Sequence, residues 1–411
     1  MGLTREQVAE RAGVEPAFVQ RLVDEGLLEA PGGVFDDADA RRARLCRGLE
    51  HAGLPLEEVG QAVDRGGLSF SFLDRPVYDR FAGLSSESFR DVSEREGIPL
   101  ELLLVVRDAI GFAQADPDDA MREDELLLVP LLRLQLARGV SAAAIEEWLR
   151  VYGDALRRIT ETEANVWYTQ ITLPQLAAGL NEAQMQELTA KWGDEFDPLM
   201  DRAVLAIYHA HQEHTWTEVL VEVVESALDR AGLRAKMRIT PAICFVDLTG
   251  FTDLTERSGD EAAADAASRL APLVRRTVER HGGKVVKWLG DGVMLYFGRA
   301  ADAVSATVEI VEATTDAGLP PAHAGIHMGP VVFQGGDYFG RTVNVAARIM
   351  EQAQRGQILV SDDVARTVDG GTFTLSSIGP VDLKGVPRPM RLHCVERGRS
   401  GPGHAREFTA P

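Results

Sequence analysis

Ala242–Thr252 reads Ala-Ile-Cys-Phe-Val-Asp-Leu-Thr-Gly-Phe-Thr, and this stretch decides the fold of the second half of the chain. Its apolar start, up to Val246, predicts a short buried strand that ends at Asp247. Thr249-Gly250-Phe251-Thr252 then predicts a turn into a long helix over about Leu254–His281. Because N–H groups at the start of a helix bind anions, this turn is a candidate phosphate-binding site.

The residues that follow predict further strands and helices. Two strand patterns, Lys284–Leu289 and Val293–Phe297, flank the tight turn Gly290-Asp291-Gly292, which is a strong hairpin signal. Beyond them we expect the helices Ala301–Ala317 and Asn344–Ala353 and the strands Ala322–His327, Val331–Phe333 and Ile358–Val360. Strands that alternate with helices and hairpins predict an α+β layer fold, with the helices over one sheet face.

Two aspartates stand at the ends of these strands. Asp247 ends the first strand, and Asp291 lies in the hairpin turn. A lone aspartate at a strand end is commonly a helix cap. A second one in a Gly-Asp-Gly turn favours a metal site, because Mg²⁺ is usually held by one or two carboxylates together with phosphate oxygens.

The second half of the chain matches a known family in the order and spacing of six residues. These are Asp247, Lys287, Asp291, Asp337, Asn344 and Arg348. From about residue 240 to 397 the chain resembles the catalytic domain of the class III nucleotidyl cyclases. The resemblance implies a ferredoxin-like βαββαβ core. It also implies two Mg²⁺ or Mn²⁺ ions per site, bound by Asp247, Asp291 and the Leu248 carbonyl, which would activate the ribose 3′-hydroxyl.

Lys287 and Asp337 occupy the positions that select the base in this family. A Lys/Asp pair resembles the adenine-selective form, so the implied substrate is ATP. Adenine offers an acceptor at N1 and a donor at N6, which a cation and a carboxylate complement, whereas guanine offers the opposite pattern. A lysine that only faces solvent on a strand is the alternative for Lys287, although the chain has only five lysines.

The remaining site residues would act on the phosphates and the ribose. Asn344 and Arg348 lie four residues apart, on one face of a predicted helix. The resemblance implies that Asn344 orients the ribose and that Arg348 stabilises charge on the α-phosphate. Thr249, Gly250, Phe251 and Thr252 would contact phosphate oxygens. Lys384 is a candidate triphosphate contact, although a strand-end lysine is often only a surface charge.

The family resemblance also implies a second chain. In the family, the metals are bound by one protomer and the base and transition state by the other. One chain that carries all six residues therefore predicts a head-to-tail homodimer with two equivalent sites. Activity would then depend on how the two catalytic domains meet, which gives the first half of the chain a regulatory purpose.

Residues 1–66 show helical apolar spacing broken by turn signals. Thr4 is a predicted cap for a first helix, a second follows over Ala17–Glu25, and two more begin near Asp36 and after Gly53. The segment resembles the MerR-type helix-turn-helix in three places: Val8-Ala9 with Gly13-Val14, Glu25-Gly26-Leu27-Leu28, and Gly53-Leu54 with Leu56-Glu57-Glu58-Val59. The predicted recognition helix offers Gln20 and Arg21 against Asp24 and Glu25, so packing is favoured over DNA binding.

A diverged repeat of this segment is predicted in residues 67–160. Ser88, Val92 and Gly97-Ile98 lie 84 residues after Thr4, Val8 and Gly13-Val14, and Gly139-Val140 lies 86 after Gly53-Leu54. We expect its helices at Leu100–Ile110, Leu126–Ala137 and Ala142–Tyr152. Residues 161–235 predict a transmission region with helices at Leu173–Leu180, Glu182–Trp192, Asp197–His214 and Thr217–Ala231.

His209, His211 and His214 cluster in this transmission region. A metal site or a pH sensor is one interpretation. Only His211 and His214 share a helix face, and no cysteine or carboxylate completes an evident metal set, so a solvated or packed group of histidines is favoured. The signal that residues 1–235 sense, a small molecule, a proton or a protein partner, stays open.

Charge separates the two halves of the chain. Residues 1–235 carry 23 Lys and Arg against 43 Asp and Glu, which accounts for the whole net charge of −20, whereas residues 236–411 carry 20 of each. The acidic half disfavours unaided nucleic-acid binding. No apolar run is long enough to span a bilayer, and Cys46, Cys244 and Cys394 fit a reduced interior, so we expect a cytoplasmic protein with a disordered tail at 398–411.

The sequence therefore predicts an adenylate cyclase with a catalytic domain at 236–397 and an all-α regulatory region before it. A guanylate cyclase remains an alternative, as does a transcription regulator whose cyclase-like half only senses nucleotide. The intact set of six residues favours the enzyme, since a sensor has no need of it.

Overall fold

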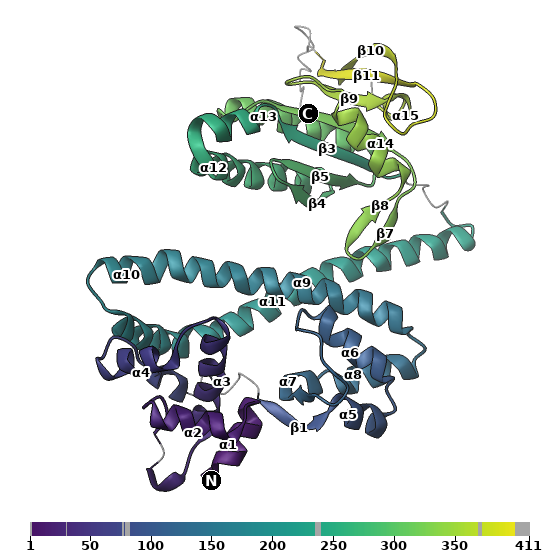
Figure 1. Ribbon diagram of the computed structural model, residues 1–411. Coiled ribbons are helices and arrows are strands. Elements are labelled where there is room, and N and C mark those ends of the chain that lie inside the picture. Colours follow the sequence, from purple (N-terminus) through teal and green to yellow (C-terminus); the bar gives the residue numbers. More distant parts are fainter. Residues whose placement is uncertain are drawn as a thin grey trace, which may run out of the picture. The chain divides into compact units, whose positions relative to one another are not determined.

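A computed structural model describes residues 2–29, 31–75, 78, 83–234, 240–368 and 372–398, without the side chains of 252–255, 257, 258 and 260. The chain divides into two compact units, Met1–Val224 and Glu225–Pro411 (Figure 1). Among the described residues, no helix is long and apolar enough to cross a membrane. The predicted tail lies outside these residues from 399 onward.

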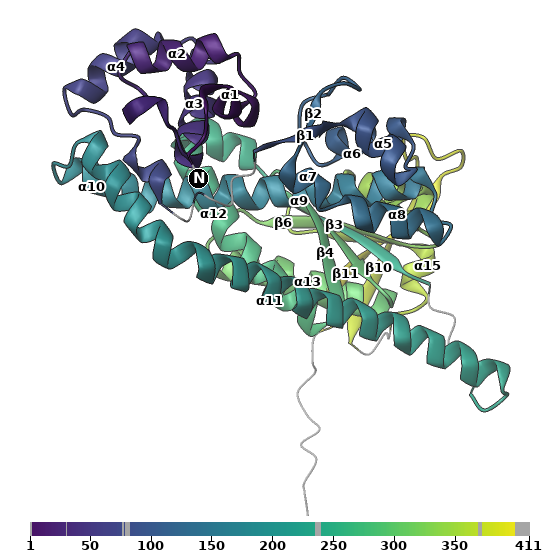
Figure 2. The ribbon, with the colours of Figure 1, turned by 90° about the horizontal axis from the view of Figure 1, so that it is seen from below.

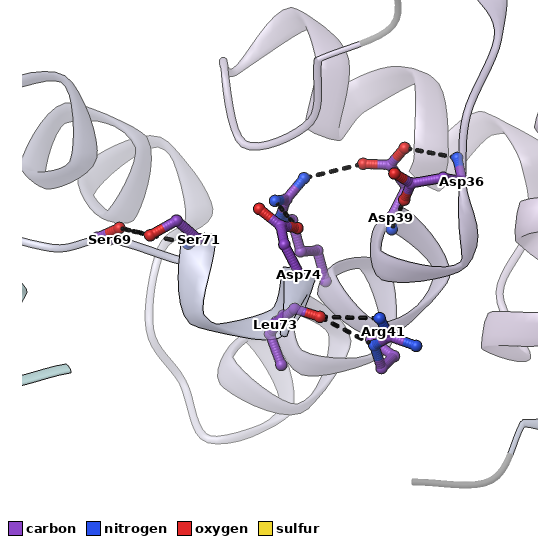
Figure 3. Close-up of polar contacts among 8 residues, drawn as sticks. Asp36, Asp39, Arg41, Ser69, Ser71, Leu73 and Asp74 are labelled. Atoms are coloured by element: carbon purple, nitrogen blue, oxygen red, sulfur yellow. Dashed lines mark hydrogen bonds and ion pairs between the residues drawn. The ribbon is translucent and has the colours of Figure 1, made fainter. Parts of the chain in front are cut away.

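Unit 1 begins with the four predicted helices: α1 (Arg5–Ala12), α2 (Pro16–Asp24), α3 (Asp37–His51) and α4 (Leu56–Asp64). Thr4 and Asp36 each form a capping box at the start of α1 and α3, which satisfies N–H groups that have no partner within the helix. Arg41 of α3 donates two hydrogen bonds to the Leu73 carbonyl in a 3-10 turn, Ser71–Asp74 (Figure 3). The helices enclose one apolar core that includes Val8, Val19, Leu22, Ala43 and Cys46.

The next part of unit 1 has a similar order of elements. It contains β1 (Leu84–Ser88), α5 (Phe89–Glu96), α6 (Leu100–Ala109), β2 (Ala120–Arg122), α7 (Glu123–Leu126) and α8 (Val129–Ala137). Ser88 forms a capping box on α5 and Gly97 ends that helix in the left-handed region, as Thr4 and Gly13 do for α1. The pairing of β1 with β2 was not predicted. A second apolar core includes Phe89, Leu103, Leu132 and Ile145.

Two long helices follow, and the second of them continues past the end of unit 1. α9 (Ala142–Trp167) continues through a π-helical turn, η4 (Tyr168–Thr172), into α10 (Leu173–Ala177), and α11 (Glu182–Arg230) follows. Trp167 contacts Trp192, and Tyr152 contacts Tyr208, so α9 and α11 run antiparallel beside each other (Figures 1 and 2).

The prediction of three separate helices between Glu182 and Ala231 is wrong. α11 is one helix of 49 residues with Pro198 inside it, and α9 likewise extends beyond the predicted end at Tyr152. The first predicted break, residues 193–196, contains one glycine, Gly193. A single glycine costs about 1 kcal/mol in a helix interior, which tertiary packing can offset.

Unit 2 contains the predicted βαββαβ core. Its elements are β3 (Ala242–Leu248), α12 (Phe251–Arg280), β4 (Gly283–Leu289), β5 (Gly292–Phe297), α13 (Ala300–Asp316) and β6 (Ala322–Met328). The order β6-β3-β5-β4, with every pair antiparallel, is that of a ferredoxin-like sheet, so the predicted fold class is confirmed.

Further elements extend this core. The sheet continues from β6 to β9 (Ile358–Ser361), β11 (Met390–Arg397) and β10 (Phe373–Val381). The hairpin of β7 (Val332–Gln334) and β8 (Asp337–Phe339) leads into α14 (Arg341–Met350), and α15 (Asp362–Ala365) follows β9.

Helices cover both faces of the sheet, so the expectation of helices over one face is wrong. Along β3, Cys244 and Val246 face the main core with α12 and α13, whereas Ile243 and Phe245 pack with Ala346 of α14. A strand that is apolar at every position buries both faces, which accounts for the difference. α14 lies so close to β6 that a Cβ at Gly325 would stand 2.1 Å from the Met350 backbone nitrogen.

Candidate functional site

Asp247 and Asp291 lie close together, on the end of β3 and in the turn between β4 and β5. A Cβ at Gly292 would stand 2.7 Å from Oδ1 of Asp247, so this turn needs a glycine to approach the carboxylate. Burial raises the pKa of Asp247, the charge of Asp291 raises it further, and His323 opposes the rise. Two crowded, partly buried carboxylates are a natural site for a cation.

The donor set fits Mg²⁺ or Mn²⁺. Within the described part of the chain, no three His, Cys, Asp or Glu side chains gather to hold a metal ion on their own. Two carboxylates and the carbonyl of Leu248 would leave positions for phosphate oxygens, as Mg²⁺ sites usually do. The same observation disfavours a metal at His209, His211 and His214, which are exposed on α11.

The predicted phosphate-binding turn joins β3 to α12. Gly250 has a φ of 80°, and α12 begins at Phe251, so the turn uses the left-handed freedom of glycine immediately before a helix start. The Thr249 N–H donates to the Pro321 carbonyl at 2.9 Å. Phe251 packs against the main core. The side chain of Thr252 lies outside the described residues.

Lys287 and Asp337 form an ion pair between β4 and the first residue of β8. Asp337 also accepts a hydrogen bond from the Tyr338 N–H at 2.8 Å. Lys287 lies opposite Met294, which packs in the α14-side cluster, so the pair occupies that sheet face. The structure therefore brings together the two residues that sequence alone placed 50 positions apart.

Asn344, Arg348 and Lys384 line one cavity of about 690 Å³, together with Gly340 and Arg341. The first two come from α14, and Lys384 comes from the loop between β10 and β11. Arg348 also forms an ion pair with Glu351 on the same helix. The cavity thus gathers cationic and amide donors suited to phosphate oxygens.

The sequence did not single out His323. Its Nε2 stands 4.0 Å from Oδ2 of Asp247, and its Nδ1 stands 3.1 Å from Oγ1 of Thr249. Strands β3 and β6 were predicted, and a ferredoxin-like core implies that they pair. The register of that pairing, which sets His323 opposite Asp247, was not predicted.

Comparisons with known proteins identify the family of the chain. Over 397 residues the chain is 30% identical to a pH-sensitive adenylate cyclase of Mycobacterium tuberculosis, covering 94% of this chain and 96% of that protein. The chain belongs to the class III adenylate cyclase family. Residues 22–215 match the adenylate cyclase regulatory domain, and residues 321–397 match the adenylate and guanylate cyclase catalytic domain.

Other members of this cyclase family match smaller parts of the chain. An adenylate cyclase of Streptomyces coelicolor is 28% identical over 66% of this chain and 70% of its own length. A solved adenylate/guanylate cyclase/hydrolase from Silicibacter pomeroyi is 28% identical, with a TM-score of 0.35, over 38% of this chain and 95% of that one. The adenylyl cyclase of P. aeruginosa is 24% identical, with a TM-score of 0.36, over 41% and 98%.

Proposed function

We propose that this protein is an adenylate cyclase that converts ATP to 3′,5′-cyclic AMP and pyrophosphate. The observation that carries the proposal is the Lys287–Asp337 ion pair, which lies on the sheet face that α14 covers. Asp247 and Asp291, which lie close together in the same unit, add to it. The names of two relatives, which match 94% and 66% of this chain, support adenylate over guanylate cyclase.

The chain's own residues divide the work of the reaction. Asp247, Asp291 and the Leu248 carbonyl would hold two Mg²⁺ or Mn²⁺ ions. When bound, these ions activate the ribose 3′-hydroxyl and neutralise charge on the triphosphate. The N–H groups of the Thr249–Thr252 turn would receive phosphate oxygens at the start of α12.

Lys287 and Asp337 would read the adenine edge. The Lys287 ammonium donates to N1, and the Asp337 carboxylate accepts from the N6 amino group. Guanine would place a donor against the lysine and an acceptor against the carboxylate, which leaves both groups unsatisfied.

Asn344, Arg348 and Lys384 would act on the ribose and the phosphates. Asn344 orients the ribose, and Arg348 stabilises the charge that grows on the α-phosphate during in-line attack. Preorganised donors of this kind lower a barrier by several kcal/mol. Lys384 holds the triphosphate in the same cavity.

We infer that a second copy of the chain completes each site in a head-to-tail dimer. An apolar surface on the β7–β8 hairpin supports this inference, because Val332, Phe333 and Phe339 are at least half exposed. Large exposed apolar side chains on one short hairpin favour a protein partner.

Residues 1–235 would regulate the catalytic domain, 236–397. We propose a helix-turn-helix scaffold of the MerR type at 1–66, a diverged copy of it at 67–160 and a transmission region at 161–235. The matching capping boxes at Thr4 and Ser88 support the repeat. Excess negative charge disfavours DNA as a partner. The name of the Mycobacterium relative suggests pH as the signal that this region senses.

The cysteines of the described residues are free, which supports a cytoplasmic location.

A complementation assay tests both the activity and the shared site. Purified wild type should convert ATP to cyclic AMP with Mg²⁺ or Mn²⁺ and should use GTP poorly. Asp291→Ala and Arg348→Ala should each be inactive, and a mixture of the two should recover activity at one site per heterodimer. Confirmed heterodimers without recovery would contradict a site shared between chains. A preference for GTP would establish a guanylate cyclase instead.

A further inference from the structure

His323 lies beside both Asp247 and Thr249 of the phosphate-binding turn. It lies on β6, directly opposite Asp247 in the antiparallel pairing of β3 with β6. Because opposite residues of an antiparallel pair point to the same sheet face, its ring shares the face of the Asp247 carboxylate. The side chain is 14% exposed, so this placement is held by packing.

The ring contacts the phosphate-binding turn as well as the carboxylate. Nδ1 of His323 lies 3.1 Å from Oγ1 of Thr249, within hydrogen-bond distance. The backbone of Thr249 is held separately, by its hydrogen bond to Pro321 on the segment that leads into β6. The first residue after Leu248 is therefore tied to the β6 side twice, once through the main chain and once through His323.

One tautomer of the ring serves both contacts. With its proton on Nε2, His323 presents an N–H dipole to Asp247, and its Nδ1 accepts a hydrogen bond from the Thr249 hydroxyl. The 4.0 Å separation from Oδ2 of Asp247 is too long for a hydrogen bond, so Thr249 fixes the ring and the ring orients the carboxylate electrostatically.

We propose that His323 is a positioning residue that sets Asp247 and the Thr249 turn in register for the bound metal ion. The inference rests on the proposed function, since it needs Asp247 to bind the ion. A side chain that orients a metal-binding carboxylate without touching the metal commonly changes the affinity for the ion by tenfold or more when it is removed.

Mn²⁺ binding, measured by electron paramagnetic resonance on the full chain, gives a readout that does not depend on turnover. His323→Leu and Thr249→Val should each raise the Mn²⁺ dissociation constant about tenfold. The double variant should bind Mn²⁺ only slightly more weakly than either single variant, because each substitution removes the same hydrogen bond. His323→Asn, which keeps a polar group near the position of Nδ1, should stay within about threefold of wild type.

Two controls separate positioning from folding and from direct ligation. His393→Leu removes a partly buried histidine that hydrogen-bonds Asp362 in the same unit, and it should leave Mn²⁺ affinity unchanged. Electron spin echo spectra of bound Mn²⁺ should lack the coupling of a directly bound histidine nitrogen. Such a coupling, lost in His323→Leu, would make His323 a ligand and overturn the proposal.

The outcomes also separate this inference from the proposed function. If wild type and Asp247→Asn bind Mn²⁺ equally, the assignment of Asp247 fails. If Asp247→Asn loses Mn²⁺ while His323→Leu and Thr249→Val bind it as wild type does, only the role of His323 fails. Thr249→Val is nearly isosteric, so it decides the matter even where His323→Leu does not fold.

Discussion

Lys287 and Asp337 neutralise each other in the nucleotide-free chain, so adenine must replace that ion pair with two contacts of its own. We predict that Lys287→Met lowers kcat/KM for ATP by about 100-fold and lowers it much less for GTP, because the site loses a donor that only adenine uses. The ratio of ATP to GTP turnover measures the effect. Lys284→Met, on the same strand, is the matched control and should leave the ratio unchanged; a fall in both activities by one factor would contradict base reading.

His327 is a buried histidine outside the proposed chemistry. Its Nδ1 lies 2.8 Å from the Ser361 hydroxyl, and burial lowers its pKa, while Asp363 acts to raise it and Arg341 to lower it further. Below pH 6.5 the unfolded chain therefore binds more protons at this residue than the folded chain. Its contribution to stability is complete above pH 6.5 and is lost as the pH falls toward the folded pKa.

We therefore predict that the melting temperature of unit 2 falls between pH 7.5 and pH 5.5, and that His327→Asn makes this fall smaller. Calorimetry at the two pH values measures the difference. The exposed His211 supplies the control, since His211→Asn should keep the wild-type slope. An unchanged slope in His327→Asn would show that other groups cause the acid sensitivity.

At the scale of elements, the β7–β8 hairpin carries apolar side chains into solvent. Phe339 is 50% exposed, and Phe333 is 63% exposed. We predict that Phe339→Asp weakens dimerisation at least tenfold without lowering the melting temperature, because an exposed residue leaves no cavity behind. Sedimentation velocity over a range of concentrations measures the shift. Ile378→Asp changes an exposed residue of β10 and should have no effect; equal effects of the two variants would exclude a specific role for the hairpin.

The sequence predicted individual elements better than the register in which they pair. Val246 and its neighbours, the Gly290-Asp291-Gly292 turn and the helix of Asn344 and Arg348 carry local signals, and the structure has the expected element at each. The cross-strand position of His323 depends on the register between β3 and β6, which no local pattern contains. The side of the sheet that α14 covers was missed for the same reason, because it is fixed by long-range packing.

At the scale of the whole molecule, α11 is continuous through the boundary between the two units. If regulation passes along this helix, activity should depend on the rotation of the part after Val224 about the helix axis, relative to the part before it. We predict that two alanines inserted after Val224, about 200° of helix rotation, change activity at least fivefold, whereas four, about 400° in total, nearly restore the wild-type phase. Cyclic AMP production between pH 5.5 and 8 measures both. Two insertions that behave alike would exclude transmission by helix phase.

The carboxylates of Asp247 and Asp291 and the cavity of Asn344 and Arg348 are separate clusters within one chain, and their proposed pairing across two chains has a consequence for inheritance. A copy that lacks both Asp291 and Arg348 would disable every partner it joins, since neither site of such a pair is complete. Expressed in equal amount with the intact copy, it would leave only about a quarter of the dimers active. An allele that lacks both groups would therefore be dominant over a functional one, whereas an allele that lacks only one of them would leave each mixed dimer with one working site.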